Sequence, residues 1–169
     1  MHYIKCANAQ CATGLTMSHR LYVPVTTAKP KGFLQLVAIP DSLLVAHQQI
    51  ACGLTTDVIS ELASQLAWEP AAICRIVGIE RTTFQRRAKK SDASSRVLNS
   101  EQSAKIYLFT KVMEAAIGLF EGNVDKAKGW LQKPARALGH SCPIDLLSTP
   151  AGVEAVLDLI GKIEHGIVI

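Results

Sequence analysis

Apolar residues recur at the spacing of an α-helix over most of the chain after its first fifty residues. A period of three to four residues brings such side chains onto one helix face. Val58, Leu62 and Leu66 predict a first helix of this kind, with Thr55 or Thr56 as its N-cap. The chain has no internal repeat and no low-complexity tract, and the pattern as a whole indicates a mainly α-helical fold.

Two short helices are predicted next. Pro70 opens the first of them, at a position where its missing N–H costs no hydrogen bond. Gly78 ends this helix, because the chain is expected to turn there into a left-handed conformation. The second is predicted from Glu80 to about Lys90, with Phe84 and Ala88 facing inward. The buried side of the helix that Pro70 opens is formed by Ile73, Cys74, Ile76 and Val77.

A long helix and several shorter ones follow a polar connector over residues 91–99. Ser100 is expected to open a helix from Glu101 to about Phe120, which Gly122 ends. Asn123 is expected to cap a short helix that closes before Pro134. Along one side of this long helix lie Ala104, Leu108, Ala115 and Leu119.

The last predicted helix follows Thr149-Pro150, a cap followed by proline in the first helical turn. Gly166 marks the end of this last helix, and a shorter helix over Pro143–Leu147 precedes it. Its inward face is predicted to carry Val153, Val156, Leu157 and Ile160.

The first fifty residues are weakly patterned and punctuated by prolines. Residues Phe33–Ile39 predict a short strand, and Asp41 or Ser42 is a candidate cap for a helix running to about Gln49. Met17 is an equally good start of translation. The role of this segment stays open, with self-association as one candidate.

The composition limits the classes of function. At 169 residues, 49% hydrophobic and 19% charged, the chain is expected to form one ordinary domain or two very small ones. No apolar run approaches the roughly 18 residues needed to cross a bilayer. The five cysteines are scattered and odd in number, which favours a reducing cytoplasm over a disulfide framework.

Enzyme chemistry finds no support in the motifs. The chain has no glycine-rich phosphate loop, no paired-carboxylate spacing and no supported Cys/His or Ser/His arrangement. Zinc binding by Cys6 and Cys11 with His2 or His19 matches no strong ligand spacing. We therefore expect neither catalysis nor a metal or other cofactor.

The positive charge is concentrated in one segment. Between Arg75 and Arg96 lie seven basic residues and only Glu80 and Asp92 as acidic ones, a balance of +5 in a chain of net charge +4. A focused basic patch suits a polyanion, because neutralised phosphates release their counterions. A solvated helix face is the alternative interpretation of charge alone.

The spacing in this segment is that of a helix-turn-helix. The small residue Cys74 lets two helices cross closely, Gly78 makes the turn, and Phe84 anchors the second helix. Glu80 stands where serine or threonine would cap that helix more securely. A generic helical hairpin with a charged face is the alternative.

The outward face of the second helix is predicted to contact DNA. Donor-rich side chains suit base edges in the major groove, and cations at the helix end suit phosphates. A single helix-turn-helix contacts only a few base pairs, so a dimer is expected, formed through the long helix or the N-terminal segment. The base-contacting candidates are Arg81, Thr82, Gln85 and Arg86, and the phosphate candidates are Arg87, Lys89 and Lys90.

Four motifs occur in order in the C-terminal third: Trp130–Gly139 (WLQKPARALG), Pro143–Leu147 (PIDLL), Thr149–Gly152 (TPAG) and Leu159–Gly166 (LIGKIEHG). From residue 54 to residue 169 the chain closely resembles the Xre/MbcA/ParS-like antitoxins of RES–Xre toxin–antitoxin operons. It departs from the family at Cys74, where alanine is usual, and in the loop that follows Gly139.

The resemblance implies a non-enzymatic antitoxin. It would bind and neutralise a RES-domain toxin that consumes NAD, and with this toxin bind operator DNA and repress its own operon. The last helix and the tail would lie at the toxin's active-site opening, which a net negative, apolar chain end suits if that pocket is electropositive. The residues carried over are Asp158, Lys162, Glu164, His165, Gly166, Ile167, Val168 and Ile169.

These observations divide the chain into three parts. Residues 1–50 form an N-terminal extension, 51–122 a helix-turn-helix domain with the long helix, and 123–169 a toxin-binding domain. The alternative function is a stand-alone transcription regulator without a toxin. A RES-domain gene beside this one would distinguish the two.

Overall fold

The computed structural model describes residue 39 and residues 42–90 and 92–167. Every regular element in this part of the chain is a helix, which confirms the mainly α-helical prediction. All but the last residue of the predicted strand Phe33–Ile39 lies outside the described residues, as do Met17 and the candidate zinc ligands.

The helices fall where the sequence predicts them, to within about a turn. The α-helices are α2 (Leu43–Cys52), α3 (Thr56–Leu66), α4 (Pro70–Ile76), α5 (Arg81–Ala88), α6 (Ser100–Leu119), α7 (Val124–Leu131) and α8 (Pro150–Glu164). The 3-10 helices are η1 (Ala93–Arg96), η2 (Arg136–Leu138) and η3 (Pro143–Ser148). Among the described residues, no helix is long and apolar enough to cross a membrane.

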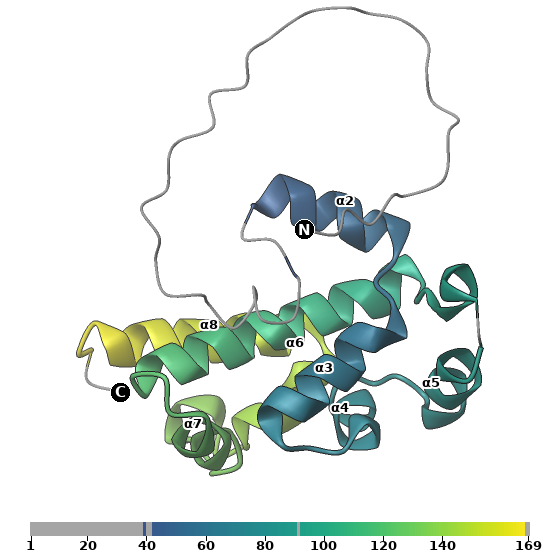
Figure 1. Ribbon diagram of the computed structural model, residues 1–169. Helices are drawn as coiled ribbons and strands as arrows, with labels where there is room; N and C mark the ends of the chain where they lie inside the picture. The colour runs from purple at the N-terminus through teal and green to yellow at the C-terminus, as the bar shows by residue number, and fades with distance from the viewer. Residues whose placement is uncertain (1–38, 40–41, 91, 168–169) are drawn as a thin grey trace, which may run out of the picture.

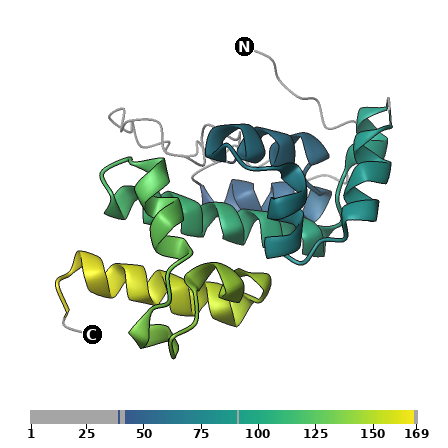
Figure 2. The same ribbon diagram turned by 90° about the horizontal axis from the view of Figure 1, so that it is seen from below.

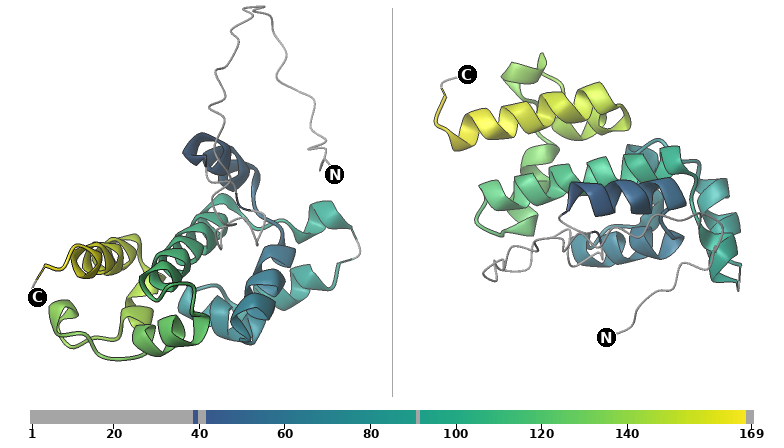
Figure 3. Two further views of the ribbon diagram at one scale, coloured as in Figure 1. Left: turned by 60° about the vertical axis from the view of Figure 1, so that its left-hand side comes forward. Right: turned by 90° about the horizontal axis from the view of Figure 1, so that it is seen from above.

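The long helix α6 lies at the centre of the molecule. In Figures 1 and 2, α3, α4 and α5 lie on one side of it and α8 lies on the other. The chain turns back after α6, so that α7 lies against its C-terminal end. Figure 3 shows the same order from two further directions, with α2 packed along α6. Both ends of the described chain therefore pack against a single helix.

The apolar stripe predicted along α6 is not its most buried side. Ala104, Leu108, Ala115 and Leu119 are only half-buried. Because α6 packs against α2, α7, α8 and η3 at once, apolar residues surround most of it and their pattern does not single out one face. Its buried residues are Ser103, Ile106, Phe109, Thr110, Val112, Met113 and Ala116.

Helix caps fix several of the boundaries. Asn99, not the predicted Ser100, caps α6: its side chain accepts from the Gln102 N–H at 2.7 Å, and the Gln102 side chain accepts from the Asn99 N–H at 3.4 Å. The predicted caps Asn123 of α7 and Thr149 of α8 are confirmed, each accepting a backbone N–H in the first turn.

One hydrophobic core joins both halves of the described chain. It extends from Ile39 through Phe109 on α6 to Ile160 on α8. Trp68, just after α3, packs against Phe109 with ring centroids 6.4 Å apart. The predicted boundary at residue 122, between the helix-turn-helix domain and the toxin-binding domain, stays a prediction. The hydrophobic core contains residues from both sides of it.

Candidate functional site

The unit formed by α4, its turn and α5 is built around a buried cysteine. Cys74 and Val77 have no exposed surface, and Gly78 adopts the predicted left-handed conformation with φ +70°. The Ile79 N–H donates to the Cys74 carbonyl at 2.7 Å and closes the turn. Burial raises the pKa of the Cys74 thiol to about 11, so this side chain packs as a small neutral group.

The outer face of α5 is open to solvent. Phe84 is 8% exposed and holds α5 against the core. Glu80 is the N-cap of α5 and makes no side-chain bond to its backbone, as its residue type predicted. The structure brings most of the predicted DNA-contacting residues together on this exposed surface, namely Arg81, Thr82, Gln85, Arg86, Lys89 and Lys90.

Two expectations about α5 need revision. Ala88 is exposed, so the prediction that it faces inward is wrong. The half-buried position one turn after Phe84 is that of Arg87, because α5 packs against η1 along this edge. The Arg87 guanidinium donates to the Val97 carbonyl. Arg87 thus differs from the other predicted phosphate candidates in holding the chain after α5 in place.

The segment after α5 is tied back to α3. Arg96 on η1 forms an ion pair with Asp57 at 3.0 Å. The Leu98 N–H donates to the Leu54 carbonyl at 2.8 Å. A Cβ at Gly53 would lie 2.3 Å from the Leu98 carbonyl oxygen, so only glycine permits this approach. These contacts fix the position of α5 relative to α3.

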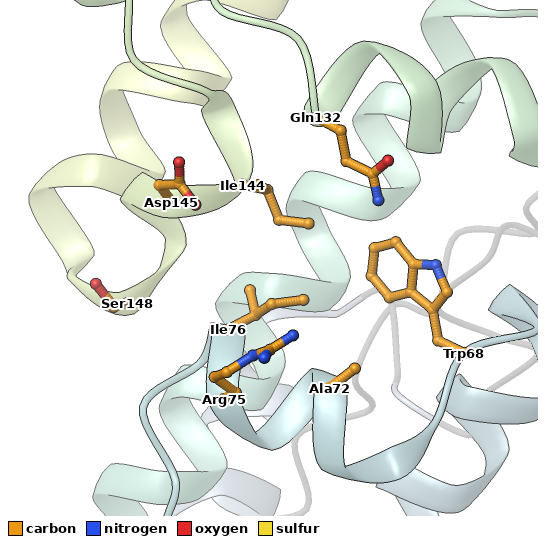
Figure 4. Close-up of a pocket in the computed structure, with 8 residues that line it drawn as sticks. All are labelled: Trp68, Ala72, Arg75, Ile76, Gln132, Ile144, Asp145 and Ser148. Carbon is orange, nitrogen blue, oxygen red and sulfur yellow. The ribbon is translucent and has the colours of Figure 1, made fainter.

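A cleft of about 520 Å³ separates α4 from η3. Figure 4 shows Arg75 and Ile76 of α4 on one side of it, and Ile144, Asp145 and Ser148 of η3 on the other. A second groove of about 470 Å³ lies between α4 and the start of α5, and Arg75 lines it as well. Arg75 belongs to the basic segment of the sequence, but only the fold reveals its exposed place on α4 beside both clefts.

The end of α8 projects away from the core with apolar side chains exposed. Ile163 is 37% and Ile167 54% exposed, and Lys162 pairs with Asp158 at 2.6 Å on the same helix. The Ile167 N–H donates to the Lys162 carbonyl at 2.9 Å. The predicted residues Glu164, His165 and Gly166 are exposed here, whereas Val168 and Ile169 lie outside the described residues.

The other exposed large apolar side chains among the described residues lie on α2. Leu43 and Leu44 are 69% and 66% exposed, and Val45 is 42% exposed. Ala46 is the buried residue of this helix. The sequence-based predictions did not include these side chains, although three consecutive large apolar residues beside a helix cap are a visible signal.

Metal binding has no candidate here: the described residues contain no cluster of histidine, cysteine, aspartate or glutamate that could hold an ion.

Residues 115–166 match the family described as the antitoxin Xre/MbcA/ParS C-terminal toxin-binding domain. This range covers the end of α6 and all of α7, η2, η3 and α8. The class of protein is therefore an antitoxin, a protein whose partner is a toxin. In this chain the matched domain carries the exposed end of α8.

Two relatives extend the similarity beyond that domain. The chain is 34% identical over 149 residues to an antitoxin Xre of Yersinia enterocolitica, covering 88% of this chain and 98% of that protein. It is also 34% identical over 116 residues to an antitoxin Xre of Photorhabdus laumondii, covering 69% and 76% of the two chains. The chain belongs to the Xre antitoxin family.

Proposed function

We propose that this protein is a non-enzymatic antitoxin that neutralises a RES-domain, NAD-consuming toxin and, together with it, binds operator DNA to repress its own operon. One observation carries the proposal: a family-matched toxin-binding domain and an exposed basic helix-turn-helix share one core. The RES identity of the toxin rests on the family resemblance.

The toxin-binding part of the proposal is supported by the end of α8. Ile163 and Ile167 expose apolar surface at the end of α8, and exposed apolar surface of this kind is suited to cover by a partner. From residue 135 to residue 169 the chain carries two basic residues against four acidic ones, which complements a pocket shaped for a dinucleotide. The candidate contacts remain Asp158, Lys162, Glu164, His165, Gly166, Ile167, Val168 and Ile169.

The DNA-binding part is supported by the exposed surface of α5. Arg81, Gln85 and Arg86 project where a recognition helix needs hydrogen-bond donors, and Lys89 and Lys90 follow at its end. Thr82 completes the candidate base-contacting set. We retain Arg87 in the set as a residue that positions α5.

Self-association is proposed through α2. The first turn of α2 exposes the apolar side chains of Leu43, Leu44 and Val45, and two copies are needed to present two recognition helices to an operator. The sequence left the choice between the long helix and the N-terminal segment open. We choose α2 because α6 is largely covered by α2, α7 and α8.

Co-expression with the neighbouring open reading frame tests the whole proposal. We expect the neighbour's product to co-purify with this protein, and cellular NAD to fall only when this protein is absent. If nothing is captured and NAD does not change, the protein is a stand-alone helix-turn-helix regulator, and its basic face is what remains of the proposal.

A further inference from the structure

The groove between α4 and α5 contains unpaired positive charge. Arg75 and Arg81 line it from its two helices, and both are exposed. Elsewhere in the described chain, Arg96, Lys105, Lys128 and Lys162 are paired with carboxylates. Neither guanidinium in the groove forms such a pair among the described residues, so both are available to an external anion.

The walls of the groove carry small and apolar side chains as well as charged ones. Ala71 and Ala72 line it on α4 and Ile79 lines it at the turn. Glu69 is the one carboxylate in this lining, so the groove holds two cations against one anion. Arginine is suited to bidentate binding of phosphate oxygens, and two guanidinium groups that line one groove can share one phosphate.

The position of the groove in the fold indicates which phosphate this is. In a helix-turn-helix the second helix enters the major groove and the first crosses the DNA backbone. Here α4 is the first helix and α5 the second, and the groove lies between them. With α5 in the major groove, this surface faces the strand that borders it.

We propose that Arg75 and Arg81 together bind one backbone phosphate of the operator, extending the DNA-binding surface from α5 onto α4. This inference rests on the proposed DNA binding and adds to it a residue, Arg75, that the sequence did not assign. It also moves Arg81 from a base contact to a phosphate contact. Register along the duplex is then set at the start of α5.

Salt-dependent DNA binding by the full-length protein tests this assignment. The probes are a duplex of the promoter region directly upstream of the gene and a scrambled duplex of equal length. Arg75→Ala and Arg81→Ala should each weaken both duplexes by about tenfold. Because the two residues serve one phosphate, the slope of log affinity against log salt should fall by about one when both are removed and by less for either alone.

A matched variant and a double variant sharpen the test. Arg136→Ala removes an equal charge from an exposed position on η2 and should leave affinity and slope unchanged. The double variant Arg75→Ala/Arg81→Ala should lose less than the two single losses combined, because both residues serve one phosphate. Thermal melting of each variant should match that of the wild type, since both side chains are exposed.

Four outcomes overturn the assignment. If Arg75→Ala leaves DNA affinity and salt slope unchanged, as Arg136→Ala should, the groove is not part of the DNA-binding surface. A loss confined to the promoter duplex assigns Arg75 to a base. If Arg75→Ala binds DNA like the wild type but no longer captures the co-expressed toxin, the groove binds an acidic segment of that protein instead. If the wild type binds neither duplex, alone or in complex with the co-expressed toxin, the proposed DNA binding fails, and this inference fails with it.

Discussion

The Lys128 ammonium of α7 donates to the Leu66 carbonyl at the C-terminal end of α3, at 2.9 Å. The same ammonium pairs with Asp125 at 2.9 Å. A cation at this position neutralises the negative end of the α3 dipole and binds one of its free carbonyls. Lys128 lies in the family-matched domain, whereas α3 precedes it, so this contact joins the two halves of the protein.

Lys128→Met should therefore destabilise the fold. The side chain is 17% exposed, and methionine keeps most of its apolar stem while removing the charge. We expect the free energy of unfolding to fall by about 1–2 kcal/mol, measured by denaturant titration. Lys126→Met, at an exposed position on the same helix, is the control. Equal stability of the two variants would mean that the Lys128 contact contributes nothing.

Gly152→Ala should be more damaging than glycine substitutions elsewhere in the helices. A Cβ at Gly152 would lie 2.0 Å from the Leu146 carbonyl oxygen, so η3 would have to move away from α8. We expect a loss of about 1–3 kcal/mol in unfolding free energy. Gly129→Ala, on α7 with open space around its Cβ, should be neutral or stabilising by up to about 1 kcal/mol. A similar loss in both variants contradicts this packing argument.

Truncation after Ile160 should separate folding from toxin neutralisation. Ile160 is 2% exposed and is the last buried residue on α8 in the described chain. The shortened protein should keep its helical circular dichroism and lose toxin capture and cell protection. Lys126→Ala, elsewhere in the matched domain, should retain both. A truncated protein that still protects cells would remove the α8 end from the toxin interface.

Arg86→Ala and Lys89→Ala should differ in their effect on sequence preference. Arg86 is placed for a base edge, so its loss should cost about 1–3 kcal/mol on the operator and relax its preference over random DNA. Lys89 is placed for a phosphate, so its loss should weaken all duplexes about equally. Fluorescence anisotropy on both duplexes measures this. Identical losses for the two variants on both DNAs would reject the assigned roles.

Leu44→Glu should weaken self-association. Leu44 is 66% exposed on α2, so a charge there is tolerated in the monomer and disfavoured in an apolar interface. We expect sedimentation to show a smaller species at micromolar concentration with unchanged melting. Glu61→Gln, exposed on α3, is the control. If Leu44→Glu sediments like the wild type, α2 is not the interface.

Local signals in the sequence located the helices well, because caps and turn glycines act over a few residues. Thr149, Asn123 and Gly78 are where they were predicted, for the reasons given. Asn99 was missed as a cap because Ser100 beside it is equally suitable by type, and only the Gln102 partner decides between them.

Tertiary contacts account for what the sequence could not give. The buried face of α6 depends on which helices surround it, and the Arg87 contact with Val97 depends on how the chain turns after α5. The concentration of basic residues between Arg75 and Arg96 did predict a solvent-exposed surface on α5. Arg75 emerged as a candidate only when α4 and α5 were placed side by side, because nothing local to it distinguishes it from any surface arginine.

The continuous core gives the proposed complex a fixed geometry. α6 is a helix of 20 residues, about 30 Å long, with the α5 region on one side and α8 on the other. In the proposed complex, a toxin bound at the end of α8 would therefore be held at a constant distance from the operator. Toxin-dependent changes in repression would then depend on how many complexes fit along the DNA without their bound toxins colliding. They would not require a hinge within the antitoxin.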